Sequence, residues 1–273
     1  MLPFVQIAHG LTRHTSSLEY QYQSGGLNEA FSDVVGAVVE FLVNDSLDTP
    51  DFDVGESLGN RLRSMEFPEQ GTTAISSVCD YSNRLSVHST SGPLNKAFVN
   101  SVRACEANGC SDERECTILL GTIYMYANVQ SLTSYSGYLD AARAICSIVD
   151  EYFAAKAPKT KCTADQVTGF IKQGWASVNV ALDDTCQSRN CCSGGCPTFD
   201  STKESSGPTP LFSSKPTASP TTLRPTLTPH IPVLTQPPVS SEPDDTATSS
   251  DSIILRVANL LRGIFNVWST FFG

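Results

Sequence analysis

The sequence predicts a mainly α-helical domain over residues 1–182, followed by a disordered stalk and a C-terminal amphipathic helix. Several segments of the first part carry apolar residues at three- and four-residue spacing, the period of an α-helix that buries one face. Residues 198–252 change to Pro, Thr and Ser with few aromatic residues, and such a composition buries too little apolar surface to order the chain. With 273 residues and 40% hydrophobic content, the chain is long and apolar enough to form a core.

The net charge limits the classes of partner. At a formal charge of −10 and a pI near 4.8, the chain would be repelled by nucleic acid phosphates and by anionic lipid. We therefore expect no nucleic acid partner, and neutral, cationic or peptidic partners remain open.

Ten cysteines indicate an oxidising compartment, so we expect a secreted or extracellular protein. An even number allows every cysteine to pair, but the spacing leaves the connectivity open. A Cys-rich cluster over residues 183–197 could instead hold a structural zinc ion. It contains no Cys-x2-Cys pair and no nearby histidine, so disulfides are the favoured interpretation.

The N-terminal part predicts two helices. Residues 1–16 fit the end of a helix, and residues 27–43 carry a continuous apolar stripe typical of a long buried helix. The N-terminus lacks the basic and apolar regions of a signal peptide, so we expect the natural chain to begin upstream of Met1. The loop that follows, residues 44–56, is dense in Asp and Glu, the oxygen ligands that calcium prefers.

Four further helices are expected before residue 182. Residues 91–102 carry Pro93 near the first turn, where proline favours helix initiation. Helical spacing of apolar residues also predicts helices at residues 117–130, 137–155 and 163–180.

The final segment, residues 253–272, is amphipathic. Arg256 and Arg262 count against a membrane-spanning helix, which needs ~20 nearly uncharged apolar residues. A helix lying in a membrane interface is one interpretation. A helix that folds back on the protein or self-associates is the other.

A histidine and a glutamate suggest a metal site. Glu29 follows His9 by twenty residues within Asn-Glu-Ala-Phe-Ser-Asp, as two zinc ligands do on neighbouring helices joined by a loop. Zinc hydrolysis needs three protein ligands, an open position for water, a base and donors for the oxyanion. Taken alone, one His and one Glu are more often ordinary polar residues.

Four motifs in order carry a family resemblance. They are His9-Gly-x-Thr, Tyr20-Gln-x-Gln-Ser-Gly-x-Leu-Asn-Glu29-Ala-Phe-Ser-Asp33, Leu62-Arg63-Ser-Met, and Val87-His88-x-x-Ser-Gly-x-Leu-Asn-Lys-Ala. Together they resemble the thermolysin-like zinc metallopeptidases. The similarity covers roughly residues 5–182 and implies the helical C-terminal domain of that family.

Aligning the sequence with the zinc-binding motif of the family implies which residues are zinc ligands. His9 matches the second histidine of HExxH and Glu29 matches the distant glutamate, which places Val5 on the first histidine and Gln6 on the catalytic glutamate. Valine cannot ligate zinc, and the glutamine amide cannot take a proton from water. Aligning His9 with the first histidine instead leaves Glu29 four residues too close, so the first register is adopted.

The resemblance also implies roles for the surrounding residues. Tyr20 and His88 match the pair that stabilises the oxyanion, and Arg63 matches the arginine that contacts the carbonyl of the substrate backbone. Asp33 matches the carboxylate that orients the first zinc histidine; without that partner it is expected to take water or a neighbouring donor. Asn83 stands where the family has an aspartate that fixes the tautomer of His88.

Calcium is the second implied cofactor. Glu40, Asp51 and Glu56 match carboxylates of a double calcium site, and clustering them without a cation would cost like-charge repulsion. The alternative is a solvated acidic face.

These observations predict the C-terminal part of a secreted zinc metalloendopeptidase, which hydrolyses peptide bonds in proteins or peptides through a zinc-activated water. The chain as written lacks the first zinc histidine and the catalytic glutamate. The alternative is a catalytically inactive homologue that binds peptides or protein partners. A weaker alternative gives the function to residues 253–272, as a segment that contacts a membrane surface.

Overall fold

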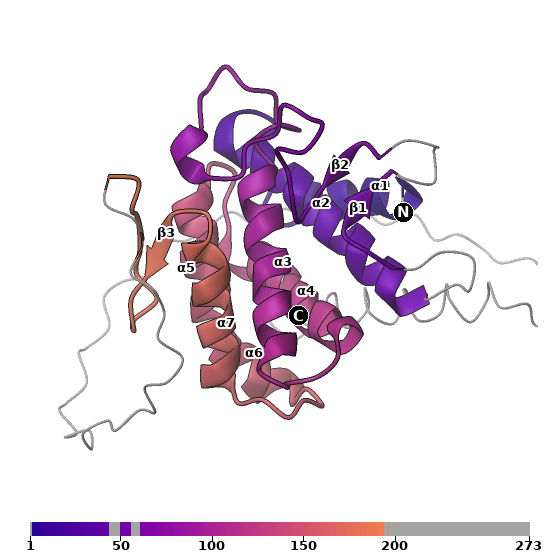
Figure 1. The fold of residues 1–273 in the computed structure, drawn as a ribbon, viewed down its shortest axis with the longest axis vertical. Helices are drawn as coiled ribbons and strands as arrows, with labels where there is room; N and C mark the ends of the chain where they lie inside the picture. Colours follow the sequence, from indigo (N-terminus) through magenta and orange to yellow (C-terminus); the bar gives the residue numbers. More distant parts are fainter. Residues whose placement is uncertain (1, 44–49, 56–60, 194–195, 197–273) are drawn as a thin grey trace, which may run out of the picture. The chain divides into compact units, whose positions relative to one another are not determined.

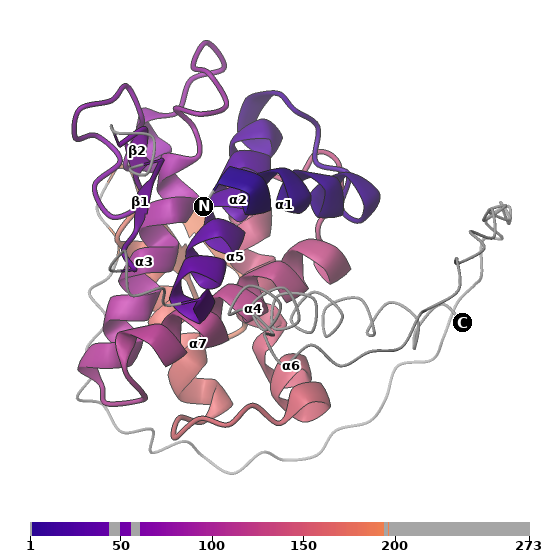
Figure 2. The same cartoon turned by 90° about the vertical axis from the view of Figure 1, so that its right-hand side faces the viewer.

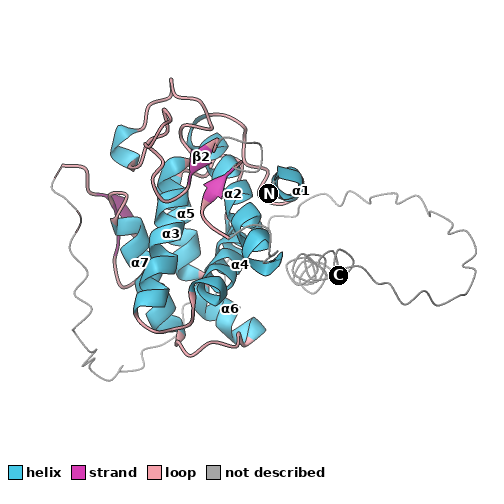
Figure 3. Cartoon of the chain, turned by 45° about the vertical axis from the view of Figure 1, so that its right-hand side comes forward, coloured by secondary structure: helices cyan, strands magenta, loops and turns pink. Residues whose placement is uncertain are grey.

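Helices make up most of the part of the chain that the structure describes (Figure 3). The computed structural model describes residues 2–43, 50–55, 61–193 and 196, all of which fall in one compact unit. The α-helices over these residues are α1 (Leu2–His14), α2 (Tyr22–Val43), α3 (Gly92–Ala107), α4 (Glu113–Ser131), α5 (Tyr138–Ser147), α6 (Val149–Lys156) and α7 (Ala164–Ala176). The mainly α prediction is confirmed. The predicted stalk and the predicted helix at 253–272 lie outside the described residues.

Helix α2 forms the centre of the core. Every residue from 24 to 39 is buried, and α1, α3 and α4 all pack against this helix (Figures 1 and 2). Beyond Asp33 the helix is apolar on nearly all sides, and such a stretch must be covered on all sides, which explains its position. The long buried helix predicted at 27–43 is therefore confirmed, although it begins five residues earlier, at Tyr22.

The remaining helices pack around α3 and α4. Helices α3 and α7 lie side by side (Figure 1), and Pro93 stands in the first turn of α3 as predicted. Asp112 caps α4 by accepting a hydrogen bond from the Glu115 N–H at 2.8 Å. Thr163 caps α7 in the same way, with the Gln166 N–H at 3.3 Å.

Two of the predicted helices are divided or end early in the structure. The segment 137–155 divides at Ile148 into α5 and α6, where Ser147, Ile148 and Val149 have modest helix propensity. The helix predicted at 163–180 ends at Ala176, because Asn179 adopts a left-handed conformation with φ of 67°.

The four short strands were not predicted. β1 (Asp53–Val54) pairs antiparallel with β2 (Arg63–Ser64), and β3 (Val180–Leu182) pairs antiparallel with β4 (Ser188–Asn190). Strands of two or three residues carry no readable alternation of apolar and polar side chains. Over the described residues, no helix is long and apolar enough to cross a membrane.

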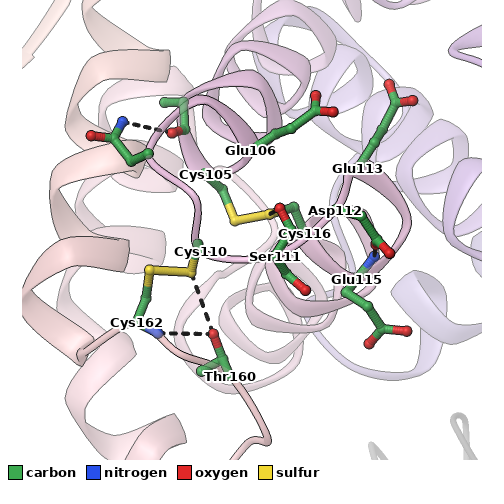
Figure 4. The surroundings of a disulfide bond; sticks show 12 residues. Cys105, Glu106, Cys110, Ser111, Asp112, Glu113, Glu115, Cys116, Thr160 and Cys162 are labelled. Atoms are coloured by element: carbon green, nitrogen blue, oxygen red, sulfur yellow. Dashed lines mark hydrogen bonds between the residues drawn. A yellow bond between two sulfur atoms is a disulfide. The ribbon is translucent and has the colours of Figure 1, made fainter.

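All ten cysteines form disulfides, which confirms that prediction and excludes the structural zinc alternative. The bonds are Cys79–Cys192, Cys105–Cys116, Cys110–Cys162, Cys146–Cys186 and Cys191–Cys196. Figure 4 shows two of them: Cys105–Cys116 joins α3 to α4, and Cys110–Cys162 ties their connection to the segment before α7. Thr160 lies beside the second bond and accepts a hydrogen bond from the Cys162 N–H at 3.2 Å (Figure 4).

Candidate active site

The carboxylate of Glu29 is the centre of a polar cluster. Glu29 lies on α2 and is 2% exposed. Tyr20 Oη donates a hydrogen bond to Oε1, and His9 Nε2 lies 3.6 Å from the same oxygen. On the other side, His88 Nδ1 lies 2.6 Å and Arg63 Nη2 lies 3.3 Å from Oε2. Residues from four separate motifs of the sequence therefore meet at one buried carboxylate.

The tautomer of His9 follows from its neighbours. Asn28 Nδ2 donates to the Leu18 carbonyl at 3.1 Å, so Asn28 Oδ1 faces His9 Nδ1, at 2.7 Å. Ser32 Oγ lies 3.1 Å from the same nitrogen and donates its own proton to the Asn28 carbonyl at 3.0 Å. Both neighbours thus accept from Nδ1, which must carry the proton. In the neutral ring, the lone pair of Nε2 then faces Glu29.

This pair fits two ligands of a zinc ion. An imidazole lone pair and a carboxylate oxygen 3.6 Å apart repel each other unless a cation or a proton lies between them. The distance is shorter than the sum of one Zn–N bond of about 2.0 Å and one Zn–O bond of about 2.1 Å, so one ion can touch both atoms. Among the side chains that the structure describes, no group of three or more His, Cys, Asp or Glu is arranged to hold a metal. The side chains of Val5 and Gln6 lie outside that part.

Asp33 and Arg63 form the buried base of the site. Arg63 donates from Nε to Asp33 Oδ2 at 2.8 Å and from Nη2 to Oδ1 at 2.6 Å, and Asn95 Nδ2 adds a third bond to Oδ2 at 2.8 Å. Burial alone would lower the pKa of Arg63, but the charges of Asp33 and Glu29 raise it above its usual value. Arg63 Nη1 has no hydrogen-bond partner among the described residues and remains available as a donor.

Tyr20 and His88 stand at the exposed edge of the cluster. Tyr20 is 55% exposed and the side chain of His88 is 59% exposed, although both donate to Glu29. Partial burial, followed by the hydrogen bond to Glu29 and its negative charge, raises the pKa of Tyr20; Arg63 opposes this only in part. Asn83 accepts a hydrogen bond from Tyr81 Oη at 2.6 Å, while His88 Nδ1 pairs with Glu29.

A pocket lies beside His9 and Tyr20, the two residues next to Glu29 Oε1. It has a volume of about 740 Å³ and is lined by His9, Arg13, Ser17, Leu18, Glu19, Tyr20 and Asn28. Three residues of the site, His9, Tyr20 and Asn28, therefore line this pocket.

The residues predicted to bind calcium are only partly described. Glu40 lies on α2, and Asp51 precedes β1, where its Oδ1 accepts a hydrogen bond from the Asp53 N–H at 2.7 Å. Glu56 lies outside the described residues. Asp53 pairs with Arg61 at 3.1 Å.

Three supporting residues were not predicted. Asn28 and Ser32 hold His9, and Asn95 holds Asp33. Asn28 and Ser32 are one helical turn apart and flank Glu29, a spacing that could have indicated a shared face. Nothing local to Asn95 indicates its partner, which is 62 positions away.

Comparison with known proteins gives consistent matches. A family described as "Thermolysin metallopeptidase, alpha-helical domain" matches residues 16–180. A neutral protease of Vibrio proteolyticus is 40% identical over 94 residues, which cover 34% of this chain and 15% of that protein. Bacillolysin of Bacillus cereus is 32% identical over 190 residues, and an extracellular elastase of Staphylococcus epidermidis is 36% identical over 181. Both alignments cover 64% of this chain and 31% of the relative.

One solved structure, the precursor of protealysin from Serratia proteamaculans, is 26% identical, with a TM-score of 0.49. The alignment covers 65% of this chain and 56% of that chain. The chain spans between 15% and 31% of the length of the curated relatives named above.

Proposed function

This chain belongs to the thermolysin metallopeptidase family, and we propose that it supplies the helical half of the active site of an extracellular zinc metalloendopeptidase. The observation that carries the proposal is the convergence of His9, Tyr20, Arg63 and His88 on the carboxylate of Glu29. A residue pair that fits a metal, two exposed donors and a fixed cation in one cluster are parts that peptide hydrolysis by a zinc enzyme requires.

His9 and Glu29 would hold the zinc ion. Zinc, when bound, supplies Lewis-acid polarisation and lowers the pKa of a water molecule. Asn28 and Ser32 fix the His9 ring so that Nε2 faces Glu29, as residues behind a metal ligand commonly do. In the same proposal Asp33 holds Arg63 against Glu29 and keeps the base of the site rigid.

Tyr20 and His88 would stabilise the oxyanion that forms at the peptide carbonyl. Both side chains are more than half exposed, so each can turn from Glu29 towards a substrate. Because its pKa is raised, Tyr20 keeps the proton that a hydrogen-bond donor needs. The Nη1 of Arg63, without a partner among the described residues, would donate to a carbonyl of the substrate backbone.

The substrate would be a protein or peptide. The name of one relative describes an extracellular elastase, and five disulfides agree with a chain that works outside the cell. Glu40, Asp51 and Glu56 are the proposed calcium ligands, whose role would be to stabilise the fold near the end of α2. Contact between residues 253–272 and a membrane surface remains a separate proposal, which vesicle co-sedimentation with and without these residues would test.

Zinc binding by defined variants tests the proposed ligands. The chain as written should bind zinc weakly, and H9A or E29A should abolish that binding. The variant with Val5→His and Gln6→Glu restores the motif at residues 5–9 and should raise zinc affinity at least about tenfold. H14A is the matched control, since His14 ends the same helix outside the cluster. Equal affinity in H9A and H14A would exclude His9 as a ligand.

A second candidate function is that of an inactive homologue that binds peptides. The observation that favours it is Val5 and Gln6 at the positions where the resemblance requires a histidine and a glutamate. The unmodified chain should then bind peptides without cleaving them, which fluorescence anisotropy and a peptide cleavage assay measure on the same sample. Zinc-dependent turnover by the unmodified chain would exclude this function.

A further inference from the structure

His88 lies on a tight turn that precedes α3. Within the turn, the Thr90 N–H donates to the Ser86 carbonyl at 3.0 Å, and Ser91 Oγ donates to the His88 carbonyl at 2.9 Å. These bonds fix the shape of the turn. They do not fix its position relative to α2, which carries Glu29, and contacts from outside the turn must do so.

The carbonyl of Thr90 is the point where the turn meets its surroundings. Tyr138 Oη donates to this oxygen at 2.6 Å, and both residues are buried. Gly26 of α2 also approaches so closely that a Cβ atom there would lie 2.5 Å from the same oxygen. Gly26 is one helical turn before Glu29. The Thr90 carbonyl therefore lies close to the backbone of α2 and accepts a hydrogen bond from the hydroxyl of Tyr138.

Tyr138 is itself fixed to α2. Its backbone N–H donates to Gln23 Oε1 at 3.0 Å, and its ring meets Tyr81 edge to face with the centroids 5.8 Å apart. Burial raises the pKa of Tyr138, with a further contribution from Tyr81, and the hydrogen bond to Thr90 offsets this only in part. The hydroxyl therefore stays protonated and donates throughout the neutral range.

The contacts form a closed circuit. It runs from Glu29 along α2 to Gln23, across to Tyr138, through Thr90 to His88, and back to Glu29 through the bond at 2.6 Å. Breaking the circuit at Tyr138 leaves the turn attached to α2 only by packing and by the His88 hydrogen bond to Glu29 itself. We propose that Tyr138 is a positioning residue, which sets the place of His88 against Glu29 by holding the Thr90 carbonyl. The inference deepens the proposed function and rests on it for the catalytic meaning of His88.

The test compares Y138F with Y124F in the full chain. Tyr124 is an equally buried tyrosine whose hydroxyl lies 3.3 Å from Ser101 Oγ, so Y124F removes a core hydroxyl without touching the His88 turn. The readout is the proton NMR signal of His88 Nδ1–H, which a hydrogen bond to a carboxylate shifts downfield and protects from exchange; H88Q assigns it. Y138F should lose this signal at neutral pH and Y124F should retain it, even if both lower the melting temperature equally.

A second variant keeps the test decisive if Y138F folds poorly. Tyr81 is only partly buried, and its ring packs against Tyr138. The Y81L variant removes this ring contact and keeps the hydroxyl of Tyr138. It should weaken the His88 signal in a folded protein. The proposal is overturned if the signal is unchanged in Y81L and in any folded Y138F.

Peptidase activity, measured beside the NMR signal, distinguishes a failure of the positioning role of Tyr138 from a failure of the catalytic role of His88. In a form that cleaves peptides, Y138F should lower kcat and leave KM unchanged. If Y138F removes the NMR signal but H88A leaves kcat unchanged, Tyr138 positions His88 and the catalytic role of His88 fails. If H88A lowers kcat but Y138F leaves both the signal and kcat unchanged, the positioning role fails.

Discussion

Arg63 binds the buried carboxylate of Asp33 through two hydrogen bonds, from Nε to Oδ2 at 2.8 Å and from Nη2 to Oδ1 at 2.6 Å. Asp33 is fully buried, and the side chain of Arg63 is 14% exposed. Geometry of this kind makes an ion pair costly to break, because removing one partner leaves the other as an uncompensated buried charge.

We therefore expect R63A to lower the free energy of unfolding by about 3–5 kcal/mol. The matched control is R61A, since Arg61 pairs with Asp53 on an exposed surface, where such pairs contribute about 0–1 kcal/mol. Urea denaturation of both variants measures the difference. Equal losses for the two would show that the Asp33 carboxylate tolerates the absence of its partner.

Removing the hydroxyl of Tyr20 should affect turnover and leave zinc binding intact. Loss of one oxyanion donor typically lowers kcat about 10²–10³-fold, so Y20F should show this loss in any form of the chain that cleaves peptides. Zinc content, measured by atomic absorption, should stay at the wild-type level because Tyr20 Oη is not a proposed ligand. Tyr22 is similarly exposed, and Y22F should match wild type in both measurements. A zinc loss in Y20F would instead assign Tyr20 to the metal site.

Alkaline pH should destabilise the fold through its buried tyrosines. Burial raises the pKa of Tyr152 from 10.0, the value of a free tyrosine, to about 12; the hydrogen bond with Thr122 opposes the rise and Tyr126 adds to it. The folded state therefore holds the proton of the Tyr152 hydroxyl more tightly than the unfolded state does. This difference in pKa stabilises the folded state fully below pH 10. The stabilisation, about 2–3 kcal/mol in total, is lost as the pH rises towards 12.

Y152F isolates this contribution, because phenylalanine does not titrate. Between pH 9 and pH 11.5, the urea midpoint of wild type should fall further than that of Y152F. The same fall in both proteins would contradict a raised pKa at Tyr152.

The disulfide that joins the most distant residues should stabilise the fold most. Cys79–Cys192 spans a sequence separation of 113, and Cys105–Cys116 spans 11. Loop-closure entropy predicts losses of about 4–5 kcal/mol for the C79S/C192S variant and about 3 kcal/mol or less for C105S/C116S. Urea denaturation under non-reducing conditions tests this order. A reversed order would mean that effects in the folded state outweigh the entropy of the unfolded chain.

The helices could be predicted because their signal is local. The apolar stripe from Leu27 to Val43 marks α2 as a buried helix, and Pro93 marks the first turn of α3. The division at Ile148 could not be predicted, since an apolar stripe continues across it and only tertiary packing decides where a weak helix former interrupts the turn.

The contacts of the site were less predictable than its members. The family resemblance identified Glu29, Arg63 and His88, but not that Arg63 and His88 both contact the carboxylate of Glu29. The bond between Asp33 and Asn95 joins positions 62 apart, and no local rule relates residues at that distance. For the same reason the disulfides could not be assigned from the sequence. Cys79 pairs with Cys192 because the segment before His88 lies beside the β3–β4 hairpin. The Val78 N–H donates to the carbonyl of Val178, just before β3, at 3.1 Å.

The two disulfides at the end of the described domain also decide how it would respond to mechanical load. Force applied to the chain after Cys196 acts first on the Cys191–Cys196 disulfide. The neighbouring Cys79–Cys192 disulfide then transmits the force to the segment before α3. Strand β4 cannot be peeled from β3 one hydrogen bond at a time, because Cys146–Cys186 anchors the hairpin to α5 on its other side. The last strands of the domain therefore act as a covalently fixed attachment point for the chain that follows.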